Sequence, residues 1–193
     1  MNIIDNVLSD QVFSNLRDLI LGSNMPWYYK EVTTYKDESN NKLYDGSFSH
    51  WALTQNGSTS EFYPVLYTSL LACLDRSGQK LDKLLRIRIG KYMLTPEEFI
   101  HTPHIDIDIP HVSGLLYLHD SDSGTHFYNE FYNPNCGVDS YTNLKQIKLT
   151  HCDTVYPKEN RFVWFDGLQY HCSSSPTTQK RRVVVNFNYT VKE

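Results

Sequence analysis

The second half of the chain is a succession of short segments in which apolar and polar residues alternate, and this pattern constrains the fold more than any other feature. Alternation with a period of two is typical of half-buried β-strands. Turn-forming residues such as Pro110 and Gly124 separate the segments. We predict strands over residues 84–94, 104–109, 112–119, 125–132, 160–166 and 181–191. So many short strands in a row indicate a barrel, a sandwich or a jelly roll.

Two helices are predicted in the first 83 residues. Ser9 is a suitable N-cap for a helix over residues 10–21 that stops at Gly22. A second helix follows Ser58 to Ser60 and runs to about Asp75, with Pro64 tolerated in its first turn. The buried stripes are expected to contain Val12, Leu16, Ile20 and Leu21 in the first helix and Tyr63, Leu66, Leu70 and Leu74 in the second. We expect both helices to brace a sheet.

Two more strands, over residues 27–34 and 47–53, are predicted between the helices. The polar segment 36–46 between them has the composition of an exposed loop. Residues 133–150 have no regular pattern and are predicted to form a loop over the functional site. Because binding residues tend to lie on loops carried by a rigid scaffold, we expect these two loops to determine specificity.

The composition is that of an ordinary globular protein and argues against two kinds of partner. Lys and Arg number 18 and Asp and Glu 22, so the net charge of −4 disfavours nucleic acid. The N-terminal residues do not resemble a signal peptide, and no apolar stretch approaches the roughly 18 residues of a membrane span.

We interpret the cysteines as free thiols of a cytoplasmic protein, since none has CxxC spacing; they are Cys73, Cys136, Cys152 and Cys172.

The segment from His104 to Ile109 carries the clearest chemistry. If the segment is a strand, the side chains of His104 and Asp106 point to the same face because they lie two residues apart. His171 is a good candidate for a third ligand. Two imidazoles and one carboxylate on one side of a metal ion leave the opposite side open, which suits non-heme iron(II) chemistry. The set contains no thiolate, so a closed structural zinc site is not indicated.

Three neighbouring polar residues compete with this assignment. Asp108 would share the face of Asp106, but it lies four residues from His104, about 13 Å along an extended strand and too far for one metal ion. His101 and His111 flank the segment. Histidines on loops beside a site more often support the ligands or contact solvent. For the whole segment, the alternative is a strand with an exposed polar face.

Taken in order, these elements resemble the iron(II)- and 2-oxoglutarate-dependent dioxygenases, and within them the prolyl 4-hydroxylase-like branch. The resemblance rests on the segments 104–106, 114–119, 160–166 with His171, and 182–188. It implies a mainly β fold with supporting helices, a double-stranded β-helix or distorted jelly roll. On this reading residues 1–193 form one domain, in which residues 84–191 are the catalytic core and residues 1–83 its support.

For the site, the resemblance implies an iron(II) ion on His104, Asp106 and His171, with 2-oxoglutarate and O2 as co-substrates. Such an enzyme would hydroxylate an unactivated C–H bond of a peptide, a protein or a small molecule, and the branch points to a prolyl residue. Tyr92 and Tyr117 are further candidates to hydrogen-bond 2-oxoglutarate. Buried tyrosines are more often simply part of a core.

The distal carboxylate of 2-oxoglutarate would bind an arginine, because the planar guanidinium matches a carboxylate with two parallel hydrogen bonds. Arg181 and Arg182 both qualify, and they point to opposite faces of the last strand. Arg182 shares its face with Val184, Asn186 and Asn188, which suits a polar cavity. This favours Arg182 and leaves Arg181 as the alternative, because a bulge would exchange the faces.

Two alternatives from other classes remain open. A jelly-roll module without catalytic activity that binds a protein or a glycan would share the architecture, since such folds host many non-enzymes. A cupin-like metalloenzyme would use the same metal ligands without 2-oxoglutarate. That enzyme would not need Arg182.

Overall fold

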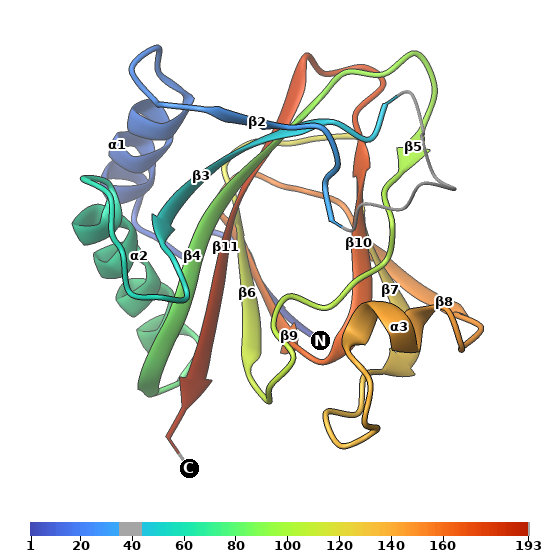
Figure 1. Cartoon of the computed structure of the whole chain (residues 1–193). Helices are drawn as coiled ribbons and strands as arrows, with labels where there is room; N and C mark the ends of the chain where they lie inside the picture. Colours follow the sequence, from blue (N-terminus) through green and yellow to red (C-terminus); the bar gives the residue numbers. More distant parts are fainter. Residues whose placement is uncertain (35–43, 193) are drawn as a thin grey trace.

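Two antiparallel sheets face each other, and two helices pack on the outer side of the larger sheet (Figure 1). The computed structural model describes residues 1–34 and 44–192. The larger sheet contains, in spatial order, β1 (Asn2–Ile4), β9 (Arg161–Asp166), β6 (Val112–Tyr117), β11 (Arg181–Val191), β4 (Leu81–Met93), β3 (Ser47–Leu53) and β2 (Tyr28–Lys30). The smaller sheet contains β5 (Phe99–Ile100), β10 (Gln169–Ser175), β7 (Thr125–Phe131) and β8 (His151–Val155). The prediction of a mainly β fold with supporting helices is confirmed.

The helices α1 (Asp10–Leu21) and α2 (Tyr63–Arg76) match the predicted ranges closely. Their buried residues pack in one core with the larger sheet; they are Phe13, Leu16 and Ile20 of α1 and Leu66, Leu70 and Leu74 of α2. Val12 is 45% exposed, so its predicted burial is wrong: the apolar stripe of α1 is centred on Phe13 instead. Among the described residues, no helix has the length and hydropathy required to cross a membrane.

The central strand β11 divides this core from the space between the sheets. Val183, Val185, Phe187 and Tyr189 face the helices. Val184, on the opposite face, packs between the sheets in a second cluster that includes residues of β6, β7 and β9. The alternation predicted for this strand therefore assigns its two faces correctly.

The segment from His104 to Ile109 is not a strand, contrary to the prediction. His104 alone pairs with His171, and the backbone N–H of each donates to the carbonyl of the other at 2.9 and 3.0 Å. The chain then leaves the smaller sheet and crosses to β6. The backbone carbonyl of Asp106 accepts from the side chain of Arg86 at 3.1 Å, which replaces the hydrogen bond that a strand neighbour would supply.

Other differences concern short elements. The strand predicted over residues 27–34 is only β2, and the irregular stretch 133–150 contains α3 (Ser140–Leu144), which Asp139 caps by accepting from the backbone N–H of Thr142. The strands β1, β5, β8 and β10 were not predicted. In β10 the residues are mostly small and polar, so no apolar alternation marks it. Of the predicted loop 36–46, residues 36–43 lie outside the described residues.

Candidate metal centre and the cavity beside it

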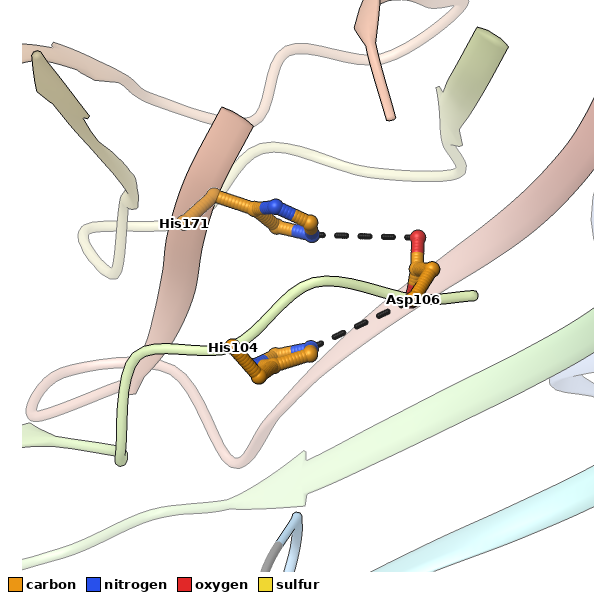
Figure 2. A group of neighbouring side chains, drawn as sticks. All are labelled: His104, Asp106 and His171. Atoms are coloured by element: carbon orange, nitrogen blue, oxygen red, sulfur yellow. Dashed lines mark ion pairs between the residues drawn. The ribbon is translucent and has the colours of Figure 1, made fainter. Parts of the chain in front are cut away.

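Three potential metal ligands from two distant parts of the chain meet between the sheets (Figure 2). His104 and Asp106 come from the segment that crosses to β6, and His171 comes from β10. The Nε2 atoms of His104 and His171 lie 3.9 and 3.7 Å from the two carboxylate oxygens of Asp106. All three ligand atoms lie within 4.8 Å of one another. The isolated bridge between His104 and His171 creates this proximity, because it fixes their backbones side by side.

Both histidines are oriented for binding a metal through Nε2. The Nδ1 of His104 lies 3.2 Å from the carbonyl of Thr102, and that of His171 lies 2.9 Å from the carbonyl of Gln169. A carbonyl only accepts, so each Nδ1 carries a hydrogen, and in the neutral imidazole the lone pair is then on Nε2. Burial and the neighbouring His171 lower the pKa of His104 to about 3. A neutral imidazole of this kind is the form that binds metals.

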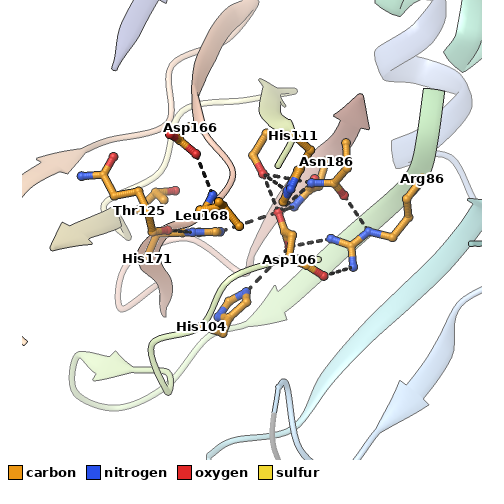
Figure 3. A network of polar contacts seen from close by, with 12 residues as sticks. Arg86, His104, Asp106, His111, Thr125, Asp166, Leu168, His171 and Asn186 are labelled. Carbon is orange, nitrogen blue, oxygen red and sulfur yellow. Dashed lines mark hydrogen bonds and ion pairs between the residues drawn. The ribbon is translucent and has the colours of Figure 1, made fainter. Parts of the chain in front are cut away.

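Asp106 is held by four side chains (Figure 3). Arg86 donates to Oδ1 at 2.5 Å. Ser113, Asn186 and Asn188 all donate to Oδ2, at 2.9, 3.0 and 2.9 Å. Burial opposes ionisation of Asp106, but the Arg86 guanidinium and the other donors outweigh it and hold the pKa of this carboxyl well below its usual value. The carboxylate is therefore charged and rigidly placed.

Arg182 lies in the same cavity as the two histidines. Its side chain is 1% exposed, and Nη2 donates to Thr125 Oγ1 at 2.6 Å. Its Nε and Nη1 are buried without a hydrogen-bond partner in the described part of the chain. Arg181 points the other way and donates to the carbonyl of Leu21 at 3.2 Å. We call this space the Arg182 cavity; its other lining residues include Arg88, Tyr92 and Asn186.

Comparison with known proteins gives matches of structure but not of sequence. No protein-family model matches the chain, and neither does any curated protein. An oxidoreductase of the 2OG-Fe(II) oxygenase family from Burkholderia pseudomallei superimposes with a TM-score of 0.66 at 10% identity, over 97% of this chain and 84% of the other. The fold is that of the 2-oxoglutarate- and iron(II)-dependent oxygenases.

Two further oxygenase-fold structures show the range of reactions. The non-heme α-ketoglutarate-dependent epimerase SnoN of nogalamycin biosynthesis has a TM-score of 0.64 at 12% identity, over 97% of this chain and 77% of its own. A prolyl hydroxylase from Trichoplax adhaerens, solved with a peptide fragment of hypoxia inducible factor, has a TM-score of 0.55 at 14% identity, over 98% and 82%. The predicted double-stranded β-helix is confirmed as the fold.

Within this oxygenase fold, the two tyrosines singled out from the sequence occupy different positions. Tyr92 lines the Arg182 cavity, and its ring lies 5.3 Å from the guanidinium carbon of Arg182. Burial raises the pKa of Tyr92, but the nearby Arg88 and Arg182 outweigh this and hold it below its usual value. Tyr117 lies behind Arg182, where its hydroxyl and Thr125 Oγ1 are 2.7 Å apart. Tyr117 therefore supports Thr125 rather than facing the cavity.

The remaining polar residues around the ligand group have structural partners. Asp108 accepts from the backbone N–H and the hydroxyl of Ser140, at 3.2 and 2.8 Å, and is not part of the ligand group. Nδ1 of His101 lies 3.0 Å from Asp45 Oδ1. Nδ1 of His111 lies 2.7 Å from the carbonyl of Ile109.

The two arginines of β4, Arg86 and Arg88, were not expected at the site from the sequence. The register pairs Arg86 with Asn188 and Arg88 with Asn186 across β4 and β11. Two arginines and two asparagines, each pair at alternate positions of a long strand, were the available signal. The sequence does not show that these two strands are neighbours, and only their pairing brings the arginines beside the asparagines.

Proposed function

We propose that this protein is an iron(II)- and 2-oxoglutarate-dependent oxygenase that hydroxylates an unactivated C–H bond. The observation that carries the proposal is Arg182: a buried guanidinium with two partnerless donors shares a cavity with two histidines that present Nε2 beside a charged Asp106. A buried donor without a partner is costly, and a ligand carboxylate would accept a hydrogen bond from one of these two donors. Among similar structures, HygX from Streptomyces hygroscopicus was solved with nickel and 2-oxoglutarate bound.

The residues present fit an iron(II) ion. Two imidazoles and one carboxylate, with no thiolate in the group, are the ligands that non-heme iron(II) oxygenases use. Asp106 does not have to lose a proton before it binds a metal ion, because its pKa is already well below the usual value. The hydrogen bonds on Nδ1 of His104 and His171 keep both Nε2 atoms directed at the centre.

When bound, iron(II) with 2-oxoglutarate and O2 supplies an oxidant strong enough for an unactivated C–H bond, and 2-oxoglutarate is converted to succinate and CO2. The residues of this chain bind and orient. Arg182 would hold the distal carboxylate of 2-oxoglutarate, with Thr125 keeping the guanidinium in place. Leu115 and Val184 form the apolar side of the cavity and exclude water from it.

Entry of 2-oxoglutarate requires the Arg182 cavity to widen. Its volume of about 20 Å³ is room for a single water molecule. Two nitrogen atoms of the lining residue Arg88, Nε and Nη2, have no hydrogen-bond partner in the described residues. We propose that Arg88 moves when 2-oxoglutarate binds.

The similar structures act on different substrates. Likeness to the prolyl hydroxylases of Trichoplax adhaerens and Pseudomonas putida supports a prolyl residue. The epimerase SnoN shares the fold, so the architecture serves more than one reaction. Hydroxylation is the reaction that we propose, with peptidyl proline as the first substrate to test.

Two alternatives explain the structure less well. A jelly-roll binding module has no need for a histidine–aspartate cluster between its sheets. A cupin-like metalloenzyme that does not use 2-oxoglutarate leaves the partnerless donors of Arg182 without a purpose.

The test is an anaerobic titration of the protein with iron(II) and then with 2-oxoglutarate. We expect the weak visible absorption band of an iron(II)–2-oxoglutarate chelate in the wild type. Arg182→Gln is expected to weaken 2-oxoglutarate binding by about 30-fold or more, because a buried charge loses its partner. Arg181→Gln is the matched control and should keep wild-type affinity. Absence of the band in the wild type would overturn the proposal.

A further inference from the structure

A second cavity lies beside the ligand cluster, and three cations, Lys30, Arg86 and Arg88, line it together with Asp106. Its volume is about 170 Å³. It shares His104 and Arg88 with the Arg182 cavity, so both spaces border the metal-ligand group. Its other lining residues come from β2, the residues after it, β3, β4 and the segment that crosses to β6. The strands β2 and β3 form one edge of the larger sheet (Figure 1). We call it the Lys30 pocket and define it by Lys30, Thr34, Trp51 and Arg88.

The cations of this pocket are not neutralised within the described residues. The charge of Arg86, which also borders the pocket, is balanced by Asp106. Lys30 and Arg88 form no ion pair with any described carboxylate. Two nitrogen atoms of Arg88, Nε and Nη2, are buried without a partner, and so is the hydroxyl oxygen of Thr34. Three hydrogen-bonding groups and two charges thus surround one small space.

Trp51 holds these cations together. The nitrogen of Lys30 and the guanidinium carbon of Arg88 lie 6.0 and 5.9 Å from the centre of its ring. Cation–π contacts of this length fix the position of a charge but do not cancel it. Burial and the nearby Arg88 lower the pKa of Lys30, which shows that its charge is costly in this position. The ring also gives the pocket a flat apolar wall.

We propose that the Lys30 pocket binds an anionic group of the substrate, and that this group is a carboxylate. The inference rests on the proposed function, because it takes the neighbouring cluster as the reacting centre. A carboxylate would accept hydrogen bonds from Arg88, Lys30 and Thr34 at once and compensate both charges. A neutral prolyl side chain alone would do neither, so a peptidyl proline substrate would need an acidic side chain close to the proline. The substrate is therefore an acid, either a small carboxylic acid or a chain bearing an acidic side chain.

Matched pairs of an acid and its uncharged amide test the proposal by calorimetric titration. Phenylacetate and 4-methylpentanoate, each beside its amide, represent small acids. N-acetylglutamate amide, beside N-acetylglutamine amide, represents an acidic side chain. Each probe is titrated into the protein alone and into protein saturated with Mn²⁺ and 2-oxoglutarate. We expect at least one acid to bind about tenfold or more tighter than its amide, and the pair that shows this preference identifies the source of the carboxylate.

The variants assign the preference to the pocket. Lys30→Gln and Arg88→Gln should each reduce the preference for the acid to less than about threefold. Lys91→Gln is the control, because Lys91 is another partly buried lysine that packs over an aromatic ring, that of Trp27, but lies outside the pocket. It should keep the preference. Since Lys30 does not border the Arg182 cavity, Lys30→Gln should also bind 2-oxoglutarate as the wild type does.

Failure of this inference and failure of the proposed function give different results. If the wild type binds 2-oxoglutarate but no acid is preferred over its amide, the anion pocket is wrong and the oxygenase proposal stands. A preference that persists unchanged in both Lys30→Gln and Arg88→Gln also overturns the pocket. If 2-oxoglutarate does not bind but an acid preference depends on Lys30, the oxygenase proposal is wrong and the anion pocket stands.

Discussion

The guanidinium of Arg86 holds Asp106 at two points. Its Nη2 lies 2.5 Å from the carboxylate oxygen Oδ1, and its Nη1 donates to the backbone carbonyl of the same residue at 3.1 Å. The two side chains are only 9% and 4% exposed. Both the side chain and the backbone of this potential metal ligand are thus tied to β4, a central strand of the larger sheet.

Replacing Arg86 by glutamine should destabilise the protein strongly. Removing one partner of a buried ion pair leaves the other charge uncompensated, which costs about 3–5 kcal/mol in the free energy of unfolding. Urea denaturation of the metal-free protein at pH 7 measures the loss.

The double variant Arg86→Gln with Asp106→Asn separates the ion pair from other effects. Once both charges are gone, the penalty of an unpaired charge disappears. The double variant should therefore lose less stability than the sum of the two single variants. Additive losses would show that the charge pair is not the source of the effect.

The stability of the metal-free protein should fall as the pH drops from 7 to 5. The pKa of His104 is lowered to about 3 in the folded state, so the unfolded chain binds a proton there in this pH range and the folded chain does not. The contribution of His104 to the free energy of unfolding should decrease by about 2 kcal/mol between pH 7 and pH 5. Urea denaturation at the two pH values measures it.

Between pH 7 and pH 5, the free energy of unfolding of His104→Gln should fall by about 2 kcal/mol less than that of the wild type. The reason is that the variant lacks the group that takes up this proton in the unfolded chain. Burial also lowers the pKa of His50, His111 and His126, so some pH dependence should remain in the variant. His151→Gln is the control, since His151 is exposed and lies outside the ligand group. An unchanged pH dependence in His104→Gln would contradict the assignment.

A divalent metal should stabilise the wild type but not a variant that lacks one ligand. A ligand that binds only the folded state at 100 times its dissociation constant adds about 2.7 kcal/mol to the free energy of unfolding. We expect Mn²⁺ to raise the melting temperature of the wild type and to have little effect on His171→Ala. His126→Gln, which alters a buried histidine outside the ligand group, should respond as the wild type does.

Two residues of α1 should respond differently to the same kind of truncation. Leu16 is 1% exposed and lies in the core between the helices and the larger sheet. Leu16→Ala should lower the free energy of unfolding by about 3 kcal/mol because it leaves a cavity. Val12 is 45% exposed, so Val12→Ala should change it by less than about 0.5 kcal/mol. Equal losses in urea denaturation would contradict the observed orientation of α1.

The helices and most strands could be predicted because their patterns are local. The alternation in β11 is an example: side chains of a strand point to opposite faces whatever the strand pairs with, so Arg182 and Val183 could be separated without a structure. The prediction for residues 104–109 was wrong because alternation does not require a strand. This segment crosses between the sheets without strand pairing, and its side chains still alternate. Ile105 packs in a small core, whereas Asp106 points toward Arg86.

The sequence by itself determined the composition of the ligand group and the faces of the long strands, since both depend on residue type and on spacing along the chain. Only the tertiary structure decided that Arg86 neutralises Asp106 and that Arg88 stands between two cavities. Those roles depend on which strands are neighbours, and on contacts between residues as far apart as Arg86 and Asn188. Long-range pairing places a charge beside its partner or leaves it without one, and no local pattern records which of the two occurs.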